Sequence, residues 1–175
     1  RKVTFDLRRR DDQWQTLSRE AYDRGDCAAL LLYDPRRRTV VLTRQFRLPA
    51  FLNGSADGML IETCAGLLDG DDPETCIRRE AEEETGYRVR QPRKVFEAYM
   101  SPGSVTEKLH FFIAEYEPQD RIRTGGGLAH EGEDIEVIEM PLAEALAGIG
   151  SGVIEDGKTV MLLQHVALML QEAAG

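Results

Sequence analysis

The stretch RREAEEETG, residues 78–86, places four glutamates in a segment whose flanks are typical of a helix. Asp71 or Asp72 can cap its start, and Pro73 fits the first turn, where the missing N–H has no partner to lose. Gly86 suits the left-handed position just past a helix end. The sequence therefore predicts a helix that begins near Pro73 and ends at Gly86. What its glutamates face decides the function.

The angular positions of the glutamates distinguish a solvated face from a binding site. At about 100° per residue, Glu80, Glu83 and Glu84 fall within one arc, which they share with the apolar Cys76. The opposite arc has its own polar residues: Glu74, Thr75, Arg78 and Glu82. Carboxylates beside a packed face repel one another and are costly to desolvate unless a cation compensates. Mg²⁺ or Mn²⁺ prefers such oxygen ligands together with substrate phosphate, so the pattern favours a metal site.

Composition excludes several other classes of function. The chain has 22 basic and 31 acidic residues, a net charge of -9, which disfavours nucleic-acid and anionic-membrane partners because both attract positive charge. Its three cysteines, Cys27, Cys64 and Cys76, form no CxxC pair and are typical of reduced thiols in a cytoplasmic protein. No signal peptide is visible, and the apolar run 160–170 is too short to span a bilayer.

The rest of the chain predicts an α/β (α+β) protein. Residues 1–22 alternate as a β-hairpin, which has to pack on another part of the chain or on a second subunit to be stable. CAALLLYD (27–34) and TVVLTRQF (39–46) are nearly continuous apolar runs, typical of strands covered on both faces. Further strands are expected in MLIETCA, KVFEAYM, LHFFIAEYE and IEVIEM, and two helices in PLAEALAGI and DGKTVMLLQHVALMLQEA. Strands on either side of one central helix predict a mixed sheet sandwiched between helices.

The segment AGLLDGDDPETCIRREAEEETGY resembles the Nudix box, G-x5-E-x7-R-E-U-x-E-E-x-G-U with U an apolar residue. Its second half matches in full, from Arg79 to Tyr87. The first half departs, because the turn after Gly66 is one residue short and Asp71 stands where a glutamate is usual. The resemblance implies the Nudix fold and Mg²⁺-dependent hydrolysis of a nucleoside diphosphate linked to another group, with Mn²⁺ able to substitute. Pyrophosphate hydrolysis needs charge neutralisation and an activated water, which suits a carboxylate-rich helix.

The Nudix resemblance also implies roles for the carboxylates. Glu80 and Glu84 would bind metal, and Arg79 would orient Glu83, which would bind metal or act in catalysis. The Ala65 carbonyl would be a further ligand. A carboxylate of the loop RTGGGLAHEGED, either Glu133 or Glu131, would complete the metal site or act as the base.

The likeness extends over nearly the whole chain. Pro102 lies fifteen residues past Tyr87, as in ADP-ribose pyrophosphatases, and EAYMSPGSVTE, HFFIAEY and DGKTV resemble the GDP-mannose pyrophosphatase branch, which shares the shortened box. That branch implies a homodimer with a hairpin, residues 1–22, exchanged between subunits, and a catalytic domain at 23–175. The expected reaction is GDP-mannose to GMP and mannose 1-phosphate. ADP-ribose cleavage is the alternative, and a non-catalytic nucleotide-binding regulator is disfavoured by the intact glutamates.

The same resemblance assigns a set of substrate contacts. From outside the box they are Arg19 and Glu20 of the hairpin, reaching the partner's site, with Arg47, Glu107 and Lys158. From the box and its preceding turn they are Ala65, Gly66, Leu67 and Glu84. Without the resemblance, Glu107 and Lys158 would pass as surface residues, Arg47 as a strand-end charge, and the glycines 125–127 as a flexible linker.

Overall fold

A computed structural model describes residues 1–173, apart from the side chain of Glu131. Its centre is the pair of apolar strands, β3 (Cys27–Asp34) and β4 (Thr39–Phe46), paired antiparallel. Every residue of β3 is buried, as its continuous apolar run predicts for a strand covered on both faces. Both strands have the bounds that the sequence predicted, and the other elements are arranged around them.

The main sheet is mixed and runs in the order β5-β4-β3-β8-β7, with β6 also paired to β3 and β9 to β4. The added strands are β5 (Met59–Glu62), β6 (Cys64–Leu67), β7 (Arg93–Tyr99), β8 (Lys108–Glu115) and β9 (Glu136–Pro141). The predicted single strand MLIETCA is wrong, because it divides at Thr63. The Thr63 N–H leaves the sheet and donates to Thr159 Oγ1 at 2.7 Å.

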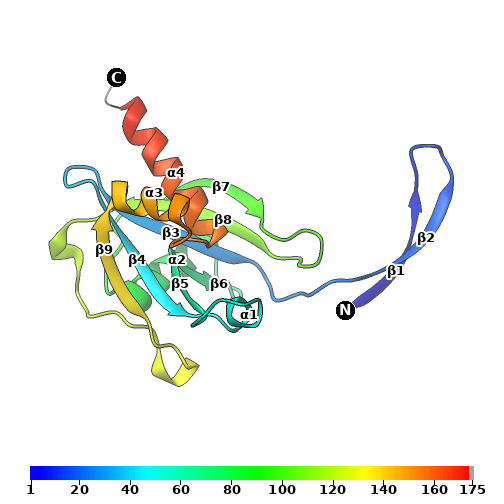
Figure 1. Ribbon diagram of the computed structural model, residues 1–175, viewed down its shortest axis with the longest axis horizontal. Coiled ribbons are helices and arrows are strands. Elements are labelled where there is room, and N and C mark those ends of the chain that lie inside the picture. The colour runs from blue at the N-terminus through cyan, green and yellow to red at the C-terminus, as the bar shows by residue number, and fades with distance from the viewer. Residues whose placement is uncertain (174–175) are drawn as a thin grey trace.

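Helices cover both faces of this sheet (Figure 1). On one face α3 (Leu142–Ser151) and α4 (Gly157–Glu172) bury a core with Leu31, Leu42 and Phe111. On the other, α2 (Pro73–Glu80) and the π-helix η1 (Ala81–Thr85) bury Cys76 and Ile77 against it. Three short helices complete the chain: α1 (Leu48–Leu52), η2 (Pro118–Asp120) and η3 (Ala129–Glu131). The predicted mixed sheet between helices is confirmed.

The glutamate helix has the predicted termini, with a change of pitch in between. Asp72 caps its start and accepts from the N–H groups of Glu74 and Thr75. The α-helical turns pass into a π-helix at Ala81, and the segment ends at Gly86 with φ of 78°. A Cβ on Gly86 would lie 2.3 Å from the Arg123 carbonyl oxygen, so both the backbone angle and the close approach require glycine.

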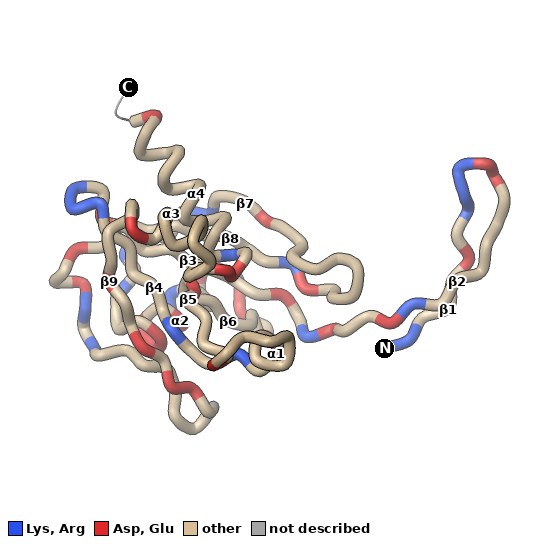
Figure 2. Tube along the Cα trace, in the orientation of Figure 1, with Lys and Arg blue, Asp and Glu red and all other residues tan. Residues whose placement is uncertain are grey.

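The N-terminal hairpin is formed by β1 (Lys2–Arg8) and β2 (Trp14–Glu20), and it extends away from the rest of the subunit (Figure 1). At its turn, residues 8–10 are arginines and residues 11–12 are aspartates, so both signs of charge lie together there (Figure 2). Its apolar side chains remain partly exposed, with Val3 at 43% and Phe5 at 40%. The predicted hairpin is confirmed. In the described part of the chain, no helix combines the length and apolar character needed to cross a membrane.

Candidate active site

The helix that carries the glutamates turns one set of them inward. Glu84 is 2% exposed, whereas the side chain of Glu74 on the outer face is 52% exposed. Glu80 and Glu83 lie between these extremes, at 13% and 21% for their side chains. The predicted inner position of Glu84 and outer position of Glu74 are therefore confirmed, whereas Glu82, predicted to face water, is only 30% exposed and lies near Arg88 and Arg123. The inner glutamates meet protein, which is the arrangement that a solvated acidic helix avoids.

Strand β6 lies directly over this inner face. The Ala65 N–H donates to Glu84 Oε2 at 3.3 Å, and Cys76 Sγ contacts the Leu67 carbonyl at 3.2 Å. Glu80 packs against Gly66 so closely that a Cβ there would lie 2.1 Å from the Glu80 carboxyl carbon. A glycine in strand β6, just before the helix, is thus required to seat a carboxylate. This requirement is a physical reason for glycine at that place in the motif.

Positively charged side chains neutralise only part of the negative charge of the inner glutamates. Arg79 Nη1 lies 2.9 Å from Glu80 and 3.3 Å from Glu83, so one guanidinium serves both. Burial, together with the charges of Glu80 and Glu133, raises the pKa of Glu84 to about 8. A hydrogen bond from Cys64 acts in the opposite direction but is outweighed. Burial also raises the pKa of Glu80, despite the opposing charge of Arg79. The site therefore favours binding of further positive charge.

The loop carboxylate Glu133 is close enough to Glu80 and Glu84 to raise the pKa of both. It accepts a hydrogen bond from the Leu128 N–H at 2.8 Å. The rival residue, Glu131, has its side chain outside the described residues. We call Glu80, Glu83, Glu84 and Glu133 the acidic cluster.

The glycines preceding that loop are not a free linker. All three have positive φ, at 74°, 114° and 77° for Gly125, Gly126 and Gly127. The Gly126 N–H donates to the Glu84 carbonyl at 2.9 Å, and that of Gly127 donates to the Glu83 carbonyl at 3.0 Å. The glycines thus satisfy the last carbonyls of η1 and hold the Glu133 loop against the acidic cluster. The simple linker interpretation is wrong, because these hydrogen bonds fix the segment to η1. Glycine is needed here because residues with side chains would be strained at positive φ.

A cleft of about 360 Å³ opens beside the acidic cluster. Its walls include residues that the sequence assigned to substrate: Arg47, Ala65, Gly66, Glu107 and Lys158. Arg24, Glu62 and Asp156 also line it, and the sequence assigned them no role. Ala65 and Gly66 thus face the cleft while contacting Glu84 and Glu80. Strand β6, which precedes the helix, is where the acidic cluster and the cleft meet.

The cations of the cleft are held by two carboxylates. Glu62, 1% exposed, accepts from Arg47 Nε at 2.6 Å and Nη2 at 3.0 Å, and from Lys158 Nζ at 2.5 Å. Lys158 Nζ also lies 3.0 Å from Asp156. Burial alone would raise the pKa of Glu62, but the hydrogen bond from Arg47 and the charges of Lys158 and Arg47 outweigh it and lower that pKa. We call Arg47, Glu62, Asp156 and Lys158 the paired cluster.

Sequence reasoning missed Glu62 and Asp156 for different reasons. Glu62 follows three apolar residues in a short strand and belongs to no motif, and its burial follows from strand pairing with β4 that only the fold supplies. Asp156 had a usable signal, since it precedes a helix, and it does cap α4 by accepting from the Thr159 N–H at 3.0 Å. Nothing in the sequence indicated that Asp156 also contacts Lys158.

Glu107 lines the cleft and is already paired. Arg24 Nε lies 3.3 Å from Glu107 Oε1, and the Cys27 thiol donates to the same oxygen at 2.9 Å. Burial, followed by the hydrogen bond to Glu107, raises the pKa of Cys27 to about 12. Cys27 is therefore a neutral donor at ordinary pH, and both of these contacts use Glu107 Oε1.

The hairpin residues Arg19 and Glu20 are both exposed, and the structure does not bring them to the cleft of their own subunit. Arg19 donates to the Ser18 carbonyl at 2.8 Å, a contact within its own strand. The hairpin points away from the body that holds the cleft (Figure 1).

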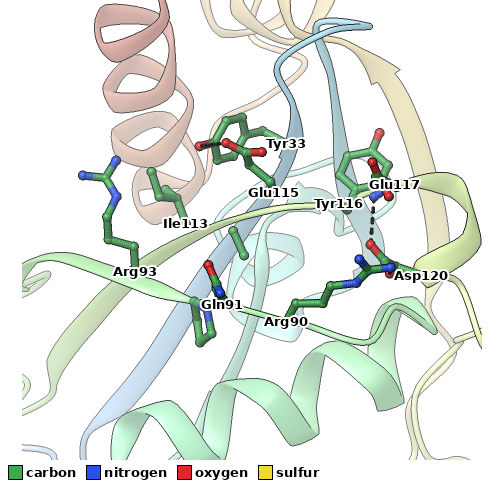
Figure 3. A pocket seen from close by; sticks show the side chains of 11 residues that line it. Tyr33, Arg90, Gln91, Arg93, Ile113, Glu115, Tyr116, Glu117 and Asp120 are labelled. Atoms are coloured by element: carbon green, nitrogen blue, oxygen red, sulfur yellow. Dashed lines mark hydrogen bonds and ion pairs between the residues drawn. The ribbon is translucent and has the colours of Figure 1, made fainter.

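A larger cavity, about 640 Å³, lies elsewhere, by the ends of β3 and β8 (Figure 3). Its charged walls pair among themselves, as in the contact of 2.5 Å between Arg90 and the buried Asp120. Tyr33 donates to Glu115 at 3.4 Å in the same cavity. It contains none of the residues predicted for metal or substrate. The candidate active site is therefore the smaller cleft, which several of the predicted substrate-binding residues line.

The fold and site define a class, and sequence comparison establishes it. The NUDIX domain pattern matches residues 23–163, and the chain belongs to the Nudix hydrolase family. Members of this family generally use divalent metal ions. Residues 1–22 match a second pattern, described as the GDP-mannose pyrophosphatase NudK N-terminal domain. The two matches meet where the hairpin segment joins the main domain.

Several relatives share a more particular name. The chain is 58% identical to the GDP-mannose pyrophosphatase of Cronobacter sakazakii over 96% of its own length and 87% of the relative's. It is 58% identical to the enzyme of the same name from Salmonella arizonae, over 95% and 86%. For that of Escherichia coli O1:K1 the identity is 56% over the same shares.

The acidic cluster fits a divalent cation by its donor set. It offers carboxylate oxygens, two of them on side chains whose burial disfavours their own charge. Within the described residues, no three such side chains are yet arranged to hold an ion. Glu80 contacts Arg79, and Glu133 accepts a hydrogen bond from the Leu128 N–H. Glu80, Glu83, Glu84 and Glu133 are the residues that would hold the ion.

Proposed function

We propose that this protein hydrolyses the pyrophosphate bond of GDP-mannose, releasing GMP and mannose 1-phosphate. The observation that carries the proposal is the meeting of the acidic cluster and the cleft at Ala65 and Gly66. A nucleotide sugar needs both halves of such a site: carboxylates for divalent metal, and cations for the diphosphate. The names of the relatives support mannose and guanine as the flanking groups.

The chain's own residues divide the work. Arg47 and Lys158 bind diphosphate oxygens, and Glu107 binds the nucleotide or sugar in the cleft. Glu133 or Glu83 accepts the proton of the attacking water as the water oxygen bonds to phosphorus and the bridging P–O bond breaks. Glu80 and Glu84, with the Ala65 carbonyl, would hold Mg²⁺, for which Mn²⁺ could substitute. When bound, such an ion would supply neutralisation of the diphosphate charge and a lowered pKa of water.

A substrate panel tests the proposal directly. GDP-mannose, GDP-glucose, ADP-ribose and ADP-glucose are offered separately with Mg²⁺, and kcat/KM is compared. We expect GDP-mannose to give the highest kcat/KM and GMP to appear with mannose 1-phosphate. Highest kcat/KM for ADP-ribose, with release of AMP, would replace this substrate assignment. Absence of turnover on every compound, with nucleotide binding retained, would favour a regulator.

We further propose that the enzyme acts as a cytoplasmic homodimer in which Arg19 and Glu20 complete the partner's cleft. The partly exposed apolar face of the hairpin, with Val3 and Phe5, supports contact with a second subunit. Three buried free cysteines support a reducing compartment. Nucleic acid is not expected to bind because of the acidic net charge.

Hybrid dimers test the exchange. Arg19→Ala and Glu84→Gln chains are unfolded together, refolded at equal concentration, and assayed on GDP-mannose. If Arg19 serves the partner, a hybrid dimer contains one wild-type site, so about a quarter of all sites recover activity under random pairing. If Arg19 serves its own subunit, mixing restores nothing. Each variant refolded alone is the control.

A further inference from the structure

Glu62 contacts both cations of the cleft and is nearly inaccessible to solvent. One oxygen accepts from Arg47 Nε, and the other accepts from Arg47 Nη2 and Lys158 Nζ. Arg47 follows strand β4 and Lys158 lies in the first turn of α4, so one carboxylate joins two elements far apart in sequence. The two cations therefore lie side by side because they share an anion.

The contacts leave donors of both cations for a ligand. Arg47 uses Nε and Nη2 on Glu62, and within the described residues Nη1 has no hydrogen-bond partner. Lys158 has three N–H donors, and its contacts are with Glu62 and Asp156. A guanidinium fixed along one edge can still present its other edge to a phosphate oxygen.

The backbone around Glu62 is fixed as well. The next residue, Thr63, donates its N–H to Thr159 Oγ1 at 2.7 Å, and that hydroxyl in turn donates to Asp156 at 2.6 Å. The carboxylate and the helix start that carries Lys158 are thus held in one register. This rigidity matters, because long cationic side chains otherwise lose conformational entropy when a ligand immobilises them.

We propose that Glu62 is a positioning residue for the reaction, holding Arg47 and Lys158 in the arrangement that receives the diphosphate. This inference rests on the proposed function in so far as Arg47 and Lys158 bind substrate. Glu62 is not a general base, because both of its oxygens accept hydrogen bonds from cations. The competing explanation is a purely structural ion-pair network that stabilises the fold and leaves substrate binding unaffected.

Glu62→Gln separates the two explanations. It keeps the shape of the side chain but removes the charge that aligns the cations. The matched control is Asp120→Asn, which removes another buried, arginine-paired carboxylate at the remote cavity of Figure 3. Both variants are assayed for kcat and KM on GDP-mannose, and for affinity toward GDP by isothermal titration calorimetry. We expect Glu62→Gln to weaken GDP binding about tenfold to a hundredfold and to raise KM more than it lowers kcat. We expect Asp120→Asn to leave GDP affinity, KM and kcat unchanged.

A double-mutant cycle then tests whether Glu62 acts through the cations. Glu62→Gln is combined with Arg47→Ala and Lys158→Ala, and GDP affinity is measured. In the background lacking both cations, we expect Glu62→Gln to have little further effect. An equal effect in both backgrounds, or unchanged GDP affinity in the single variant, overturns the proposal. If Glu62→Gln does not fold, Glu62→Asp replaces it, because the shorter carboxylate keeps the charge but cannot reach both cations equally.

The same measurements on the wild-type chain test the proposed function separately from the role of Glu62. If it binds GDP but fails to hydrolyse GDP-mannose, the proposed function is wrong. The GDP affinities of the variants would still decide the role of Glu62. If GDP-mannose is hydrolysed and the cycle shows no coupling, the function stands and the positioning role is wrong.

Discussion

The acidic cluster and the paired cluster are built from the same kinds of side chain but differ in charge balance. In the paired cluster, two carboxylates match two cations, and Glu62 accepts three hydrogen bonds. In the acidic cluster, Arg79 contacts Glu80 and Glu83 but not Glu84, which is the most buried of the inner glutamates. The pKa values follow: that of Glu62 is lowered and that of Glu84 is raised to about 8.

The difference separates two uses of buried charge. A balanced group fixes geometry, because each charge already has a partner and little is gained by rearrangement. An unbalanced group takes up a counterion, because burial penalises its uncompensated charge. In this protein the two meet at β6, so an ion taken up by one cluster would lie beside the cations fixed by the other.

Glu84→Gln should have the largest effect on catalysis. The substitution preserves volume and removes a proposed ligand, so transition-state stabilisation of several kcal/mol is lost and kcat falls by about a thousandfold. In the absence of metal the variant should be at least as stable as the wild type, because a buried carboxylate with a raised pKa is replaced by a neutral amide. Steady-state kinetics and urea unfolding measure the two quantities.

Metal binding gives that prediction its control. Mg²⁺ should raise the unfolding midpoint of the wild type, since a ligand that binds the folded state stabilises it, and should leave that of Glu84→Gln nearly unchanged. Equal Mg²⁺ stabilisation of both proteins would contradict the assignment of Glu84.

Glu62→Gln should give the largest loss of stability. Breaking a buried ion pair from one side costs about 3 kcal/mol. The folded-state pKa of Glu62 is below its ordinary value of 4.5, so its stabilisation is complete above about pH 5 and is lost as the pH falls through the folded-state pKa. The difference in unfolding free energy between wild type and variant should therefore be constant near neutrality and shrink below about pH 4.5. A difference that grew on acidification would contradict the depressed pKa.

Gly66→Ala should have an intermediate effect, confined to the acidic cluster. The added Cβ would lie 2.1 Å from the Glu80 carboxyl carbon, so Glu80 has to move. Displacing a ligand in this way costs about tenfold to a hundredfold in metal affinity or activity. Gly103→Ala is the control, because a Cβ there meets nothing within 4 Å. Metal affinity from Mn²⁺ titration should fall in the first variant and stay unchanged in the second.

The acidic cluster was largely accessible to sequence reasoning, because helical spacing is a local property. Cys76, Glu80 and Glu84 follow one another at intervals of about one turn, so they share a side of the helix even though its pitch changes at Ala81, and Glu84 is buried. The strands β3 and β4 were predicted with the same bounds for a similar reason, since a continuous apolar run decides burial on both faces.

The paired cluster was half accessible, because its contacts join distant parts of the chain. Arg47 and Lys158 came from the family resemblance, but nothing local marks Glu62, whose partner Lys158 lies 96 residues away. The tethering of Gly126 and Gly127 to η1 also depends on how the loop returns to the helix end. A pattern of three glycines specifies conformational freedom, and only the fold shows which conformation is used.

Glu74→Gln should have the smallest effect and tests the outer face of the same helix. Glu74 is exposed and pairs with Arg78 at 2.8 Å, four residues along, so its loss should lower the unfolding free energy by about 0.3–0.5 kcal/mol. Neither kcat nor Mg²⁺ stabilisation should change, although the same carboxyl group is replaced by an amide as in Glu84→Gln. A loss of activity comparable to that of Glu84→Gln would mean that the acidic composition of the helix matters rather than its facing. Equal kinetics to the wild type would locate the metal function on the inner arc, since the two glutamates differ chiefly in the side of the helix from which they project.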